Sequence, residues 1–534
     1  MSLERIPCGW LRLTGAGVLV LVLTLAARPS FADQAAGAPA PPRSLVEIPT
    51  LPSGGRVVTV PPRGDLQAAL DAARPGDTIV LEAGATYVGP FTLPNKEGAG
   101  WVTLRSSRLE QGIPAAGTRV GPQHADAMPK LVSRSKAVII AAPGAHHYRF
   151  VGIEIRPVSE AAIEYGLVIL GNMEPAPDQV PHHIIVERSY LHGDPEAPTR
   201  RGIALNGADI AVVDSYLADF KDTDHDSQAL CGWNGPGPFK IENNYLEAAG
   251  ENVMFGGSPP AIRGLIPSDI EIRRNHFAKP LAWKSKRWAV KNLFELKNAR
   301  RVLVDGNLLE HNWASAQSGF AVLFTVRGED GQAPWAVIED VTFTNNVVRD
   351  SPHGLNILAR DDGGPSGVAS RILIRNNLIT DIGARLFQVL RGPANLVIEH
   401  NTAFAKHSIA WAAGEPTPGF VLRNNVITLG DYGIIGDGTP PGSATLTRYF
   451  PGAVITGNAL LRERGANPGE YPGNTVMDAG RAGFVAAGSG DWRLRADSAL
   501  LKREGDGKGV GVDFTELLAA LKEQAALAVP GRAQ

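Results

Sequence analysis

The chain has 534 residues, a formal net charge of −2, 60 glycines and 40 prolines. This length allows several ordinary domains or one large repetitive domain, and the Gly and Pro content favours many turns and short strands over long helices. The nearly neutral charge, with Lys and Arg scattered along the chain, argues against the basic surface of a nucleic-acid-binding protein, so we expect no nucleic-acid partner.

The N-terminus has the pattern of a secretory signal. Arg5 and Arg12 precede an apolar run over residues 15–27, and Ser30-Phe31-Ala32 has the small-x-small pattern of a signal-peptidase site. We predict a signal peptide over residues 1–32 and a secreted or periplasmic protein. A retained membrane anchor is the alternative, although the run is short for a bilayer span. No later segment has the length and apolarity of a membrane span, so we expect no membrane contact after signal removal.

Cysteine usage leaves the mature chain without an internal disulfide. Of the two cysteines, Cys8 lies in the predicted signal and Cys231 lies in the apolar stretch SQALCGW. With no His beside it in the sequence, Cys231 is interpreted as a buried structural thiol rather than a nucleophile.

The segment after the signal predicts a linker and then a cap. Residues 33–62 are rich in Pro and Ala and are predicted to form a linker. Residues 65–73 have the apolar spacing of a short amphipathic helix, which Pro75-Gly76 ends before a strand over residues 78–82. One helix followed by strands indicates a cap in front of a sheet.

A strand-and-corner motif then recurs ten times: an alternating apolar strand, an Asn or Ser, two apolar residues and a polar corner, as in FKIENNYL and ILIRNNLI. The steps between anchors run from 24 to 39 residues. The anchor residues are Ser189, Ser215, Asn244, Asn275, Asn307, Asn346, Asn377, Asn401, Asn425 and Asn458.

Each copy is too small to bury its own strand faces, so the copies must stack and share a continuous core. An apolar spacing of two excludes helical repeats, and about 24 residues cannot hold the four strands of a propeller blade. A parallel β-helix with two or three short strands per coil fits. Asn tolerates the left-handed conformation of a tight corner, and stacked Asn side chains form hydrogen-bonded ladders, so the Asn column is interpreted as scaffold.

The phrase DLQAALDAARPGDTIVLEAGATYVGPF, the Asn-anchored coils and the tail DWRLRADSALLKREGDGKGVGVDF resemble the right-handed parallel β-helix proteins of the pectate lyase-like superfamily, from about Arg56 to Phe514. The resemblance implies an all-β, right-handed parallel β-helix over residues 63–514, with a short N-terminal capping helix. Residues 515–528 have the pattern of an amphipathic helix that closes or flanks the last coil, within a C-terminal helix and tail over residues 515–534.

The resemblance also implies a secreted protein that lays a polysaccharide along one face of the solenoid. Members of the superfamily most often cleave this polymer by β-elimination or hydrolysis and sometimes epimerise it. The sequence contains no HExxH, GxSxG, P-loop, Rossmann or CxxC motif, which argues against zinc-protease, serine-hydrolase and nucleotide-dependent chemistry. We expect a monomer with no organic cofactor.

Residues 200–297 contain more polar residues than a scaffold requires, and alternation along the strands predicts that they share an outward face. Glu295 with Lys291 and Lys297 is the sharpest cluster. A lysine there would neutralise a uronate carboxylate or, with its pKa lowered by a like charge, act as base, while Glu295 would act as acid or ligand. The alternative is a solvated strand edge whose charges pair with each other. The predicted catalytic residues are Lys291, Glu295, Lys297, Asp226 and Glu251, and the predicted substrate-binding residues are Arg200, Gln228, Asn252, Asn356, Gln388 and Trp233.

The loop DTDHDS offers a candidate calcium site, because Asp222, Asp224 and Asp226 alternate along an extended segment and Ca²⁺ prefers several oxygen ligands. It is not an EF-hand, since Ser227 and Trp233 stand at the positions of the turn Gly and the closing Glu. A solvated acidic loop is the alternative.

We therefore predict a polysaccharide lyase acting on a uronate-containing polymer, since β-elimination requires the mixed cations and acids found here. A glycoside hydrolase remains an alternative, with Asp226 and either Glu251 or Glu295 as its two carboxylates. A non-catalytic carbohydrate-binding or adhesion solenoid is the third possibility.

Overall fold

The computed structural model describes residues 37–51, 54–134, 137–159, 163, 165–462, 469–501 and 509–524, which belong to one compact unit. The signal peptide predicted over residues 1–32 lies outside the described residues. No helix among the described residues is long and apolar enough to cross a membrane.

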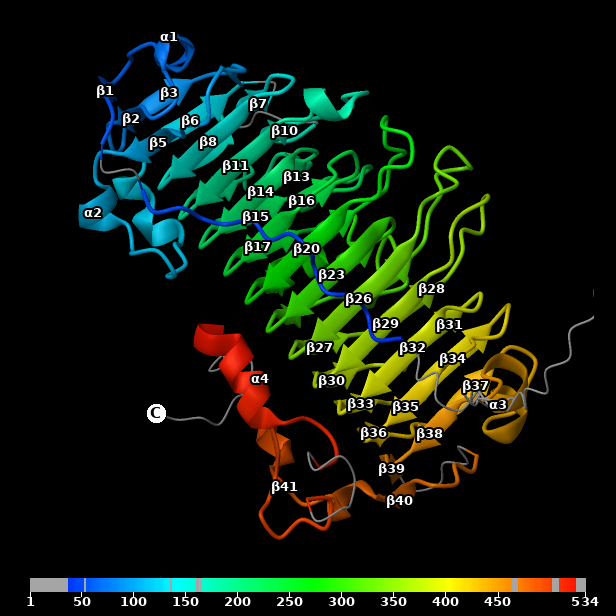
Figure 1. Cartoon of the computed structure of the whole chain (residues 1–534). Helices are drawn as coiled ribbons and strands as arrows, with labels where there is room; N and C mark the ends of the chain where they lie inside the picture. The colour runs from blue at the N-terminus through cyan, green and yellow to red at the C-terminus, as the bar shows by residue number, and fades with distance from the viewer. Residues whose placement is uncertain are drawn as a thin grey trace, which may run out of the picture. The chain divides into compact units, whose positions relative to one another are not determined.

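Three long parallel sheets form a right-handed parallel β-helix, which confirms the predicted fold (Figure 1). From β2 to β39 each coil contributes one strand to each sheet in turn, and equivalent strands of successive coils pair side by side.

Sheet A consists of β1 (Val57–Val60), β2 (Thr78–Leu81), β5 (Val102–Ser106), β8 (His146–Val151), β11 (His182–Glu187), β14 (Ala208–Val213), β17 (Phe239–Glu242), β20 (Ser268–Arg273), β23 (Ala299–Asp305), β26 (Ile338–Thr344), β29 (Ser370–Arg375), β32 (Ala394–Glu399), β35 (Val421–Arg423) and β38 (Val454–Thr456). Sheet B consists of β3 (Thr86–Val88), β6 (Lys130–Ser133), β9 (Glu154–Pro157), β12 (Tyr190–His192), β15 (Tyr216–Phe220), β18 (Tyr245–Ala248), β21 (His276–Ala278), β24 (Leu308–Glu310), β27 (Val347–Ser351), β30 (Leu378–Ile382), β33 (Thr402–Ala405), β36 (Val426–Thr428), β39 (Ala459–Arg462) and β40 (Thr475–Asp478). Sheet C consists of β4 (Phe91–Leu93), β7 (Ile139–Ala141), β10 (Val168–Leu170), β13 (Arg201–Leu205), β16 (Gln228–Gly232), β19 (Glu251–Phe255), β22 (Asn292–Leu296), β25 (Phe320–Thr325), β28 (His353–Leu358), β31 (Arg385–Leu390), β34 (Ser408–Ala413) and β37 (Ile434–Gly436).

The remaining elements are short. Strands β41 (Phe484–Ala486) and β42 (Asp491–Leu494) form an antiparallel pair. The helices are α1 (Leu66–Ala72), α2 (Leu109–Gly112), α3 (Ser443–Tyr449), α4 (Phe514–Leu521) and the 3₁₀ turns η1 (Pro122–Ala127), η2 (Pro177–Gln179), η3 (Leu281–Ser285), η4 (Ala479–Arg481), η5 (Ala487–Ser489) and η6 (Lys522–Gln524).

The core is a stack of apolar side chains that repeats from coil to coil. In sheet C, Leu230 pairs with Val253, which pairs with Phe294, and all three are fully buried. Strand alternation turns the intervening side chains outward, so the period of two read from the sequence fixes which face of each strand fills the interior.

The Asn column forms the predicted ladder. The backbone N–H and the side-chain amide of Asn244 both donate to Oδ1 of Asn275, at 2.9 and 3.0 Å, and Asn275 repeats this contact with Asn307. One detail differs from the prediction, because the left-handed residue is the one before the anchor, such as Asn243 with φ 55° or Asn376 with φ 54°. The corner residue makes the turn, and the turn points the next side chain inward onto the stack.

The N-terminal end matches the predicted helix and extends the coil stack upstream. Helix α1 is capped by Asp65, whose side chain accepts from Ala68 N at 2.9 Å. Strand β1 already pairs with β2, so the stack begins within the segment predicted as a linker. The described residues 37–51 of that segment lie along sheet A (Figure 1), where Ala40 N donates to Asp340 and Arg43 N donates to Asp269.

The C-terminal helix differs from its expected place. Helix α4 ends at Leu521 rather than Ala528, and residues 525–534 lie outside the described residues. Its buried Leu517 and Leu521 pack on Leu308, Val347 and Leu378 of β24, β27 and β30, so it covers outward apolar positions of sheet B instead of closing the last coil.

Candidate active site

Sheet C brings side chains from distant parts of the sequence into lateral contact. Gln228 pairs with Glu251, and Glu251 pairs with Asn292, on strands β16, β19 and β22. Further along β22, Glu295 stands in register with Met254. The predicted clustering of polar residues on one face of the solenoid therefore holds for these strands.

Two glutamates of this face are buried. Glu251 is 0% exposed, and its Oε2 accepts from Nε2 of Gln228 at 2.7 Å. Glu295 is 2% exposed and accepts from Nδ2 of Asn292 at 2.9 Å and from the hydroxyl of Thr325 at 3.2 Å. Burial raises the pKa of Glu251, and the nearby carboxylates of Glu295 and Asp226 raise it further.

Two lysines neutralise these acids. Lys291 pairs with Asp226, and its Nζ is 3.7 Å from Oε1 of Glu251, while Nζ of Lys297 is 4.0 Å from Oε1 of Glu295. Burial disfavours the charged form of Lys297, but Glu295, Glu251 and Asp226 outweigh it and raise the pKa of Lys297. Of the two roles expected for a lysine here, this argues against a base whose pKa is lowered by a like charge, because acids surround the ammonium group of Lys297.

A pocket of about 380 Å³ opens beside this cluster, over β22, β25 and β28. Its cations are Lys297 and Arg327, which leave successive coils side by side, since Arg327 N donates to the carbonyl of Lys297 at 3.1 Å. The guanidinium of Arg327 also pairs with Asp361, at 3.2 Å, and with Asp362. The lining residues are Glu295, Lys297, Gln317, Ser318, Phe320, Leu323, Thr325, Arg327 and Asn356.

Three predicted substrate-binding residues lie at the margins of the cluster. Asn356 lines the pocket, and Gln388 on the next coil donates to its side chain at 3.2 Å. Arg200 donates to the carbonyl of Asp226 at 3.3 Å, at the opposite end. Together they extend the polar face along several coils of sheet C.

Asn252 and Trp233 do not lie where the sequence analysis expected them. Asn252 points into the solenoid, where its amide donates to the carbonyls of Leu246 and Ala278 and its Oδ1 accepts from the buried Lys279. Trp233 is 5% exposed and packs with Cys231 and other buried side chains, so its ring is not open to a sugar. Two consecutive inward residues in β19 break the simple alternation that had assigned Asn252 to the groove.

Cys231 is fully buried, as predicted, and burial raises the pKa of its thiol to about 11. The thiol therefore stays protonated at neutral pH and is no nucleophile.

The aspartates of the DTDHDS loop do not converge. Oδ1 of Asp222 accepts from the backbone N–H groups of Asp224 and His225, and Asp226 pairs with Lys291 instead. Among the described residues, the group of three ionisable side chains close enough to share a metal ion consists of His147, His182 and His183. The loop is thus held by hydrogen bonds of its own.

Arg327 is the pocket residue that the sequence analysis missed. The signal was the similarity of FELKN and FTVRG, which place a cation just after the strand on successive coils. The unequal length of the loops hid this similarity, because Arg327 lies in the longest repeat, between the anchors Asn307 and Asn346.

Comparisons with known proteins bear on the fold. No family model matches the sequence, and no curated protein matches it. The catalytic unit of a thermostable GH87 α-1,3-glucanase from Streptomyces thermodiastaticus strain HF3-3 superposes with a TM-score of 0.50 at 15% identity, over 81% of this chain and 71% of that chain.

Two lyase structures superpose less closely. A PL6 family alginate lyase gives a TM-score of 0.44 at 16% identity, over 88% of this chain and 58% of that chain. A mannuronic acid-specific family 6 polysaccharide lyase from human gut microbiota gives 0.49 at 12% identity, over 80% and 92%. At such identities the likeness concerns the fold alone. The chain thus has a right-handed parallel β-helix fold.

Proposed function

We propose that the protein is a secreted enzyme that cleaves a uronate-containing polysaccharide by β-elimination at the sheet C pocket. The observation that carries the proposal is the pair Lys297 and Arg327, which line one pocket from successive coils with the buried Glu251 and Glu295 beside them. An anionic polymer laid across the coils would meet both cations.

β-Elimination requires three things: the uronate carboxylate is neutralised, the C5 proton is removed, and the leaving oxygen is protonated. Arg327 stays cationic at any relevant pH and is suited to hold an anionic group of the substrate. Lys297 is the pocket residue whose nitrogen can exchange a proton with the sugar, but only once its pKa falls from its raised value. The attraction of Glu295 and Glu251 must therefore be offset before Lys297 acts as base.

Calcium is part of this proposal, at a place different from the acidic loop. Oε1 of Glu251 and Oδ1 of Asn292 are buried oxygens without a hydrogen-bond partner, and Glu295 lies beside them. Carboxylate and amide oxygens are the ligands Ca²⁺ prefers, so Glu251, Glu295 and Asn292 would hold it. Bound calcium would supply positive charge next to these carboxylates, and a smaller net negative charge there lowers the pKa of Lys297.

The test is the absorbance of unsaturated products on pectate, alginate and glycosaminoglycans. Lys297→Ala and Arg327→Ala are expected to lower the rate on the order of a hundredfold or more, because each removes a group acting on the reacting sugar. The matched control is Lys240→Ala: its side chain is 18% exposed, like that of Lys297, and it also pairs with glutamates, but on sheet A. If Lys240→Ala loses as much activity as Lys297→Ala, the pocket is not the site.

The same assay separates the alternatives. New reducing ends without absorbance would indicate a hydrolase, which needs two carboxylates that reach the glycosidic bond. Against it, Glu251 is fully buried and hydrogen-bonded to Gln228. Glycan binding with no cleavage of any polymer would indicate a binding solenoid.

The proposal includes export through the predicted signal over residues 1–32 and a monomeric mature protein. Sequencing the N-terminus of the protein recovered from the culture medium or periplasm tests the export, and sedimentation tests the monomer. A start far from residue 33 would contradict the signal assignment.

A further inference from the structure

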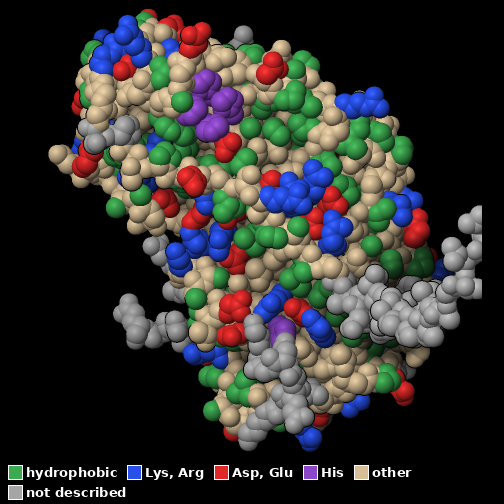
Figure 2. All heavy atoms as spheres, in the orientation of Figure 1, with side chains coloured by type: hydrophobic (Ala, Val, Ile, Leu, Met, Phe, Trp, Pro, Cys, Tyr) green, Lys and Arg blue, Asp and Glu red, His purple; other side chains and the backbone are tan. Residues whose placement is uncertain are grey.

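Four histidines form a surface cluster on sheet A, away from the sheet C pocket. His146 and His147 begin β8, and His182 and His183 begin β11, with His146 and His182 paired in register. Figure 2 shows histidine side chains gathered in one surface patch near the N-terminal end of the stack.

The backbone turns both histidines of each pair to the outside. His147 has φ 57° and His183 has φ 54°, a left-handed conformation that lets the side chains of two consecutive residues share one surface. The Nδ1 atoms of His182 and His183 are 2.7 Å apart, as are those of His146 and His147. The same left-handed conformation recurs on later coils, at Asp209 for example. The fold therefore provides this backbone geometry on several coils, and the first two of them carry histidines there.

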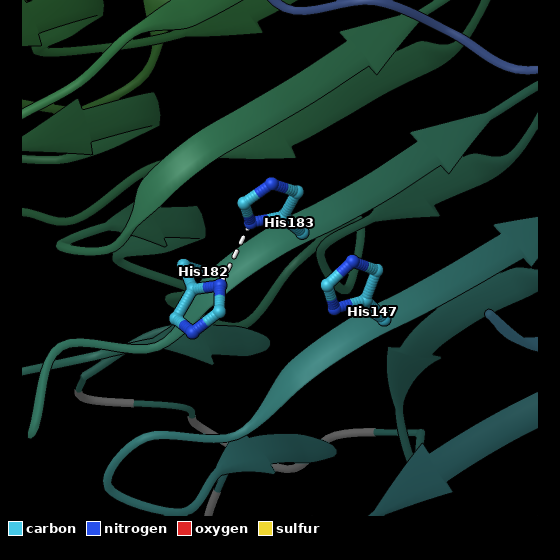
Figure 3. Close-up of side chains that lie close together, drawn as sticks. All are labelled: His147, His182 and His183. Carbon is cyan, nitrogen blue, oxygen red and sulfur yellow. Dashed lines mark hydrogen bonds between the residues drawn. The ribbon is translucent and has the colours of Figure 1, made fainter. Parts of the chain in front are cut away.

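Three of these rings converge. His147, His182 and His183 each offer a ring nitrogen, and the three nitrogens lie within 4.8 Å of one another (Figure 3). In a tetrahedral zinc site with Zn–N bonds of about 2.0–2.1 Å, ligand nitrogens lie about 3.3 Å apart. The side chains are partly exposed, so small rotations that move the ring nitrogens by on the order of 1 Å would bring them to the separation of a zinc site.

The surroundings favour a metal cation over a simple ring stack. Oδ2 of Asp209 lies 3.9 Å from Nε2 of His183, where a carboxylate can orient a ligating imidazole through its other nitrogen. A pocket of about 400 Å³ opens at this point, lined by residues 45–49, Trp101, His183 and Asp209.

We propose that His147, His182 and His183 bind one divalent transition-metal ion of the zinc class, with Asp209 orienting His183. Imidazole is a preferred ligand of Zn²⁺, Ni²⁺ and Cu²⁺, whereas Ca²⁺ prefers oxygen, so this site and the sheet C site differ in the ions they select. The ion would bridge β8 and β11 and stabilise the first coils rather than take part in cleavage.

The test uses the full-length mature protein without a histidine tag. Calorimetric titration with ZnCl₂ should show one ion per chain with micromolar or tighter affinity, and CaCl₂ should not compete. His183→Gln should weaken zinc binding at least about tenfold, and His147→Gln with His183→Gln should abolish it. The matched control is His311→Gln, since His311 also sits beside a carboxylate, Asp350, but outside the cluster.

A second readout locates the ion. The ring centroids of Trp101 and His147 are 5.2 Å apart, so Cu²⁺ bound by the cluster should quench the fluorescence of Trp101. Trp101→Phe should remove that quenching without changing the zinc stoichiometry. The inference is overturned if the folded protein binds no zinc, if the double variant binds it as tightly as the wild type, or if quenching persists in Trp101→Phe.

Discussion

Replacing Asn307 by alanine tests whether the ladder holds the coils together. Its side-chain amide donates to the carbonyl of Ile272 and to Oδ1 of Asn346, both at 2.9 Å. Its Oδ1 accepts from the backbone N–H of Asn275 at 2.9 Å and from the side-chain amide of Asn275 at 3.1 Å. Asn307→Ala therefore removes four buried hydrogen bonds and leaves a backbone donor in the interior without this partner.

The magnitude follows from the cost of unsatisfied buried groups. Each buried donor or acceptor left without a partner costs about 1–3 kcal/mol, so Asn307→Ala should lower the free energy of unfolding by about 2–5 kcal/mol. Serine should cost about half as much, because Ser215 in the same column accepts from Ser189 N through its hydroxyl and donates to Val213. Asn474 ends the column and is only partly buried, so water can replace its contacts and Asn474→Ala should cost little.

The assay is urea unfolding followed by tryptophan fluorescence, for the wild type and these three variants. The expected order of destabilisation is Asn307→Ala, then Asn307→Ser, then Asn474→Ala. Equal losses for Asn307→Ala and Asn474→Ala would refute the argument that burial gives the ladder its strength.

Three further predictions concern charge, metal and the N-terminal segment. Burial, together with the nearby Asp219, raises the pKa of Glu247 to about 7 from its usual 4.5. The folded state therefore holds the proton of Glu247 more tightly than the unfolded state, and the free energy of unfolding should fall as the pH rises from about 4.5 through 7. Glu247→Gln should flatten this fall in urea midpoints measured across that range, and an unchanged slope would contradict the assignment. In the wild type and in Asp224→Asn, EDTA should abolish the product absorbance and added Ca²⁺ should restore it. In Glu251→Gln, added Ca²⁺ should not restore the absorbance. If Asp224→Asn instead loses the response to Ca²⁺, the calcium site lies in the acidic loop. Val46 is buried against Ile185, Ala211 and Val213. Val46→Asp should therefore speed proteolysis within residues 37–51 and change the far-ultraviolet circular dichroism little. An unaltered digestion pattern would show that this contact does not hold the segment on sheet A.

The candidate site was only partly predictable from the sequence. Glu251, Lys291, Glu295 and Lys297 were identified because charged residues are unusual in strands that otherwise read as apolar, and the structure brings them into one cluster. Asn252 was misassigned because the alternation rule fails where a strand turns two successive residues inward. The raised pKa of Lys297 depends on which coil lies beside which, and spacing along the chain does not contain that information.

The sequence by itself determined the architecture. Few folds bury every strand of a chain that has a two-residue apolar period, a recurring Asn and corners at intervals of 24 to 39 residues. These features depend only on residues within one coil, so they can be recognised in the sequence. Only the tertiary structure decided which side chains meet across coils, because lateral neighbours are set by strand register and by loops of unequal length. Arg327 beside Lys297, the place of α4 on sheet B and the three converging histidines all depend on that register. Stacking energy fixes the register over the whole solenoid at once, so no single segment of the chain encodes it.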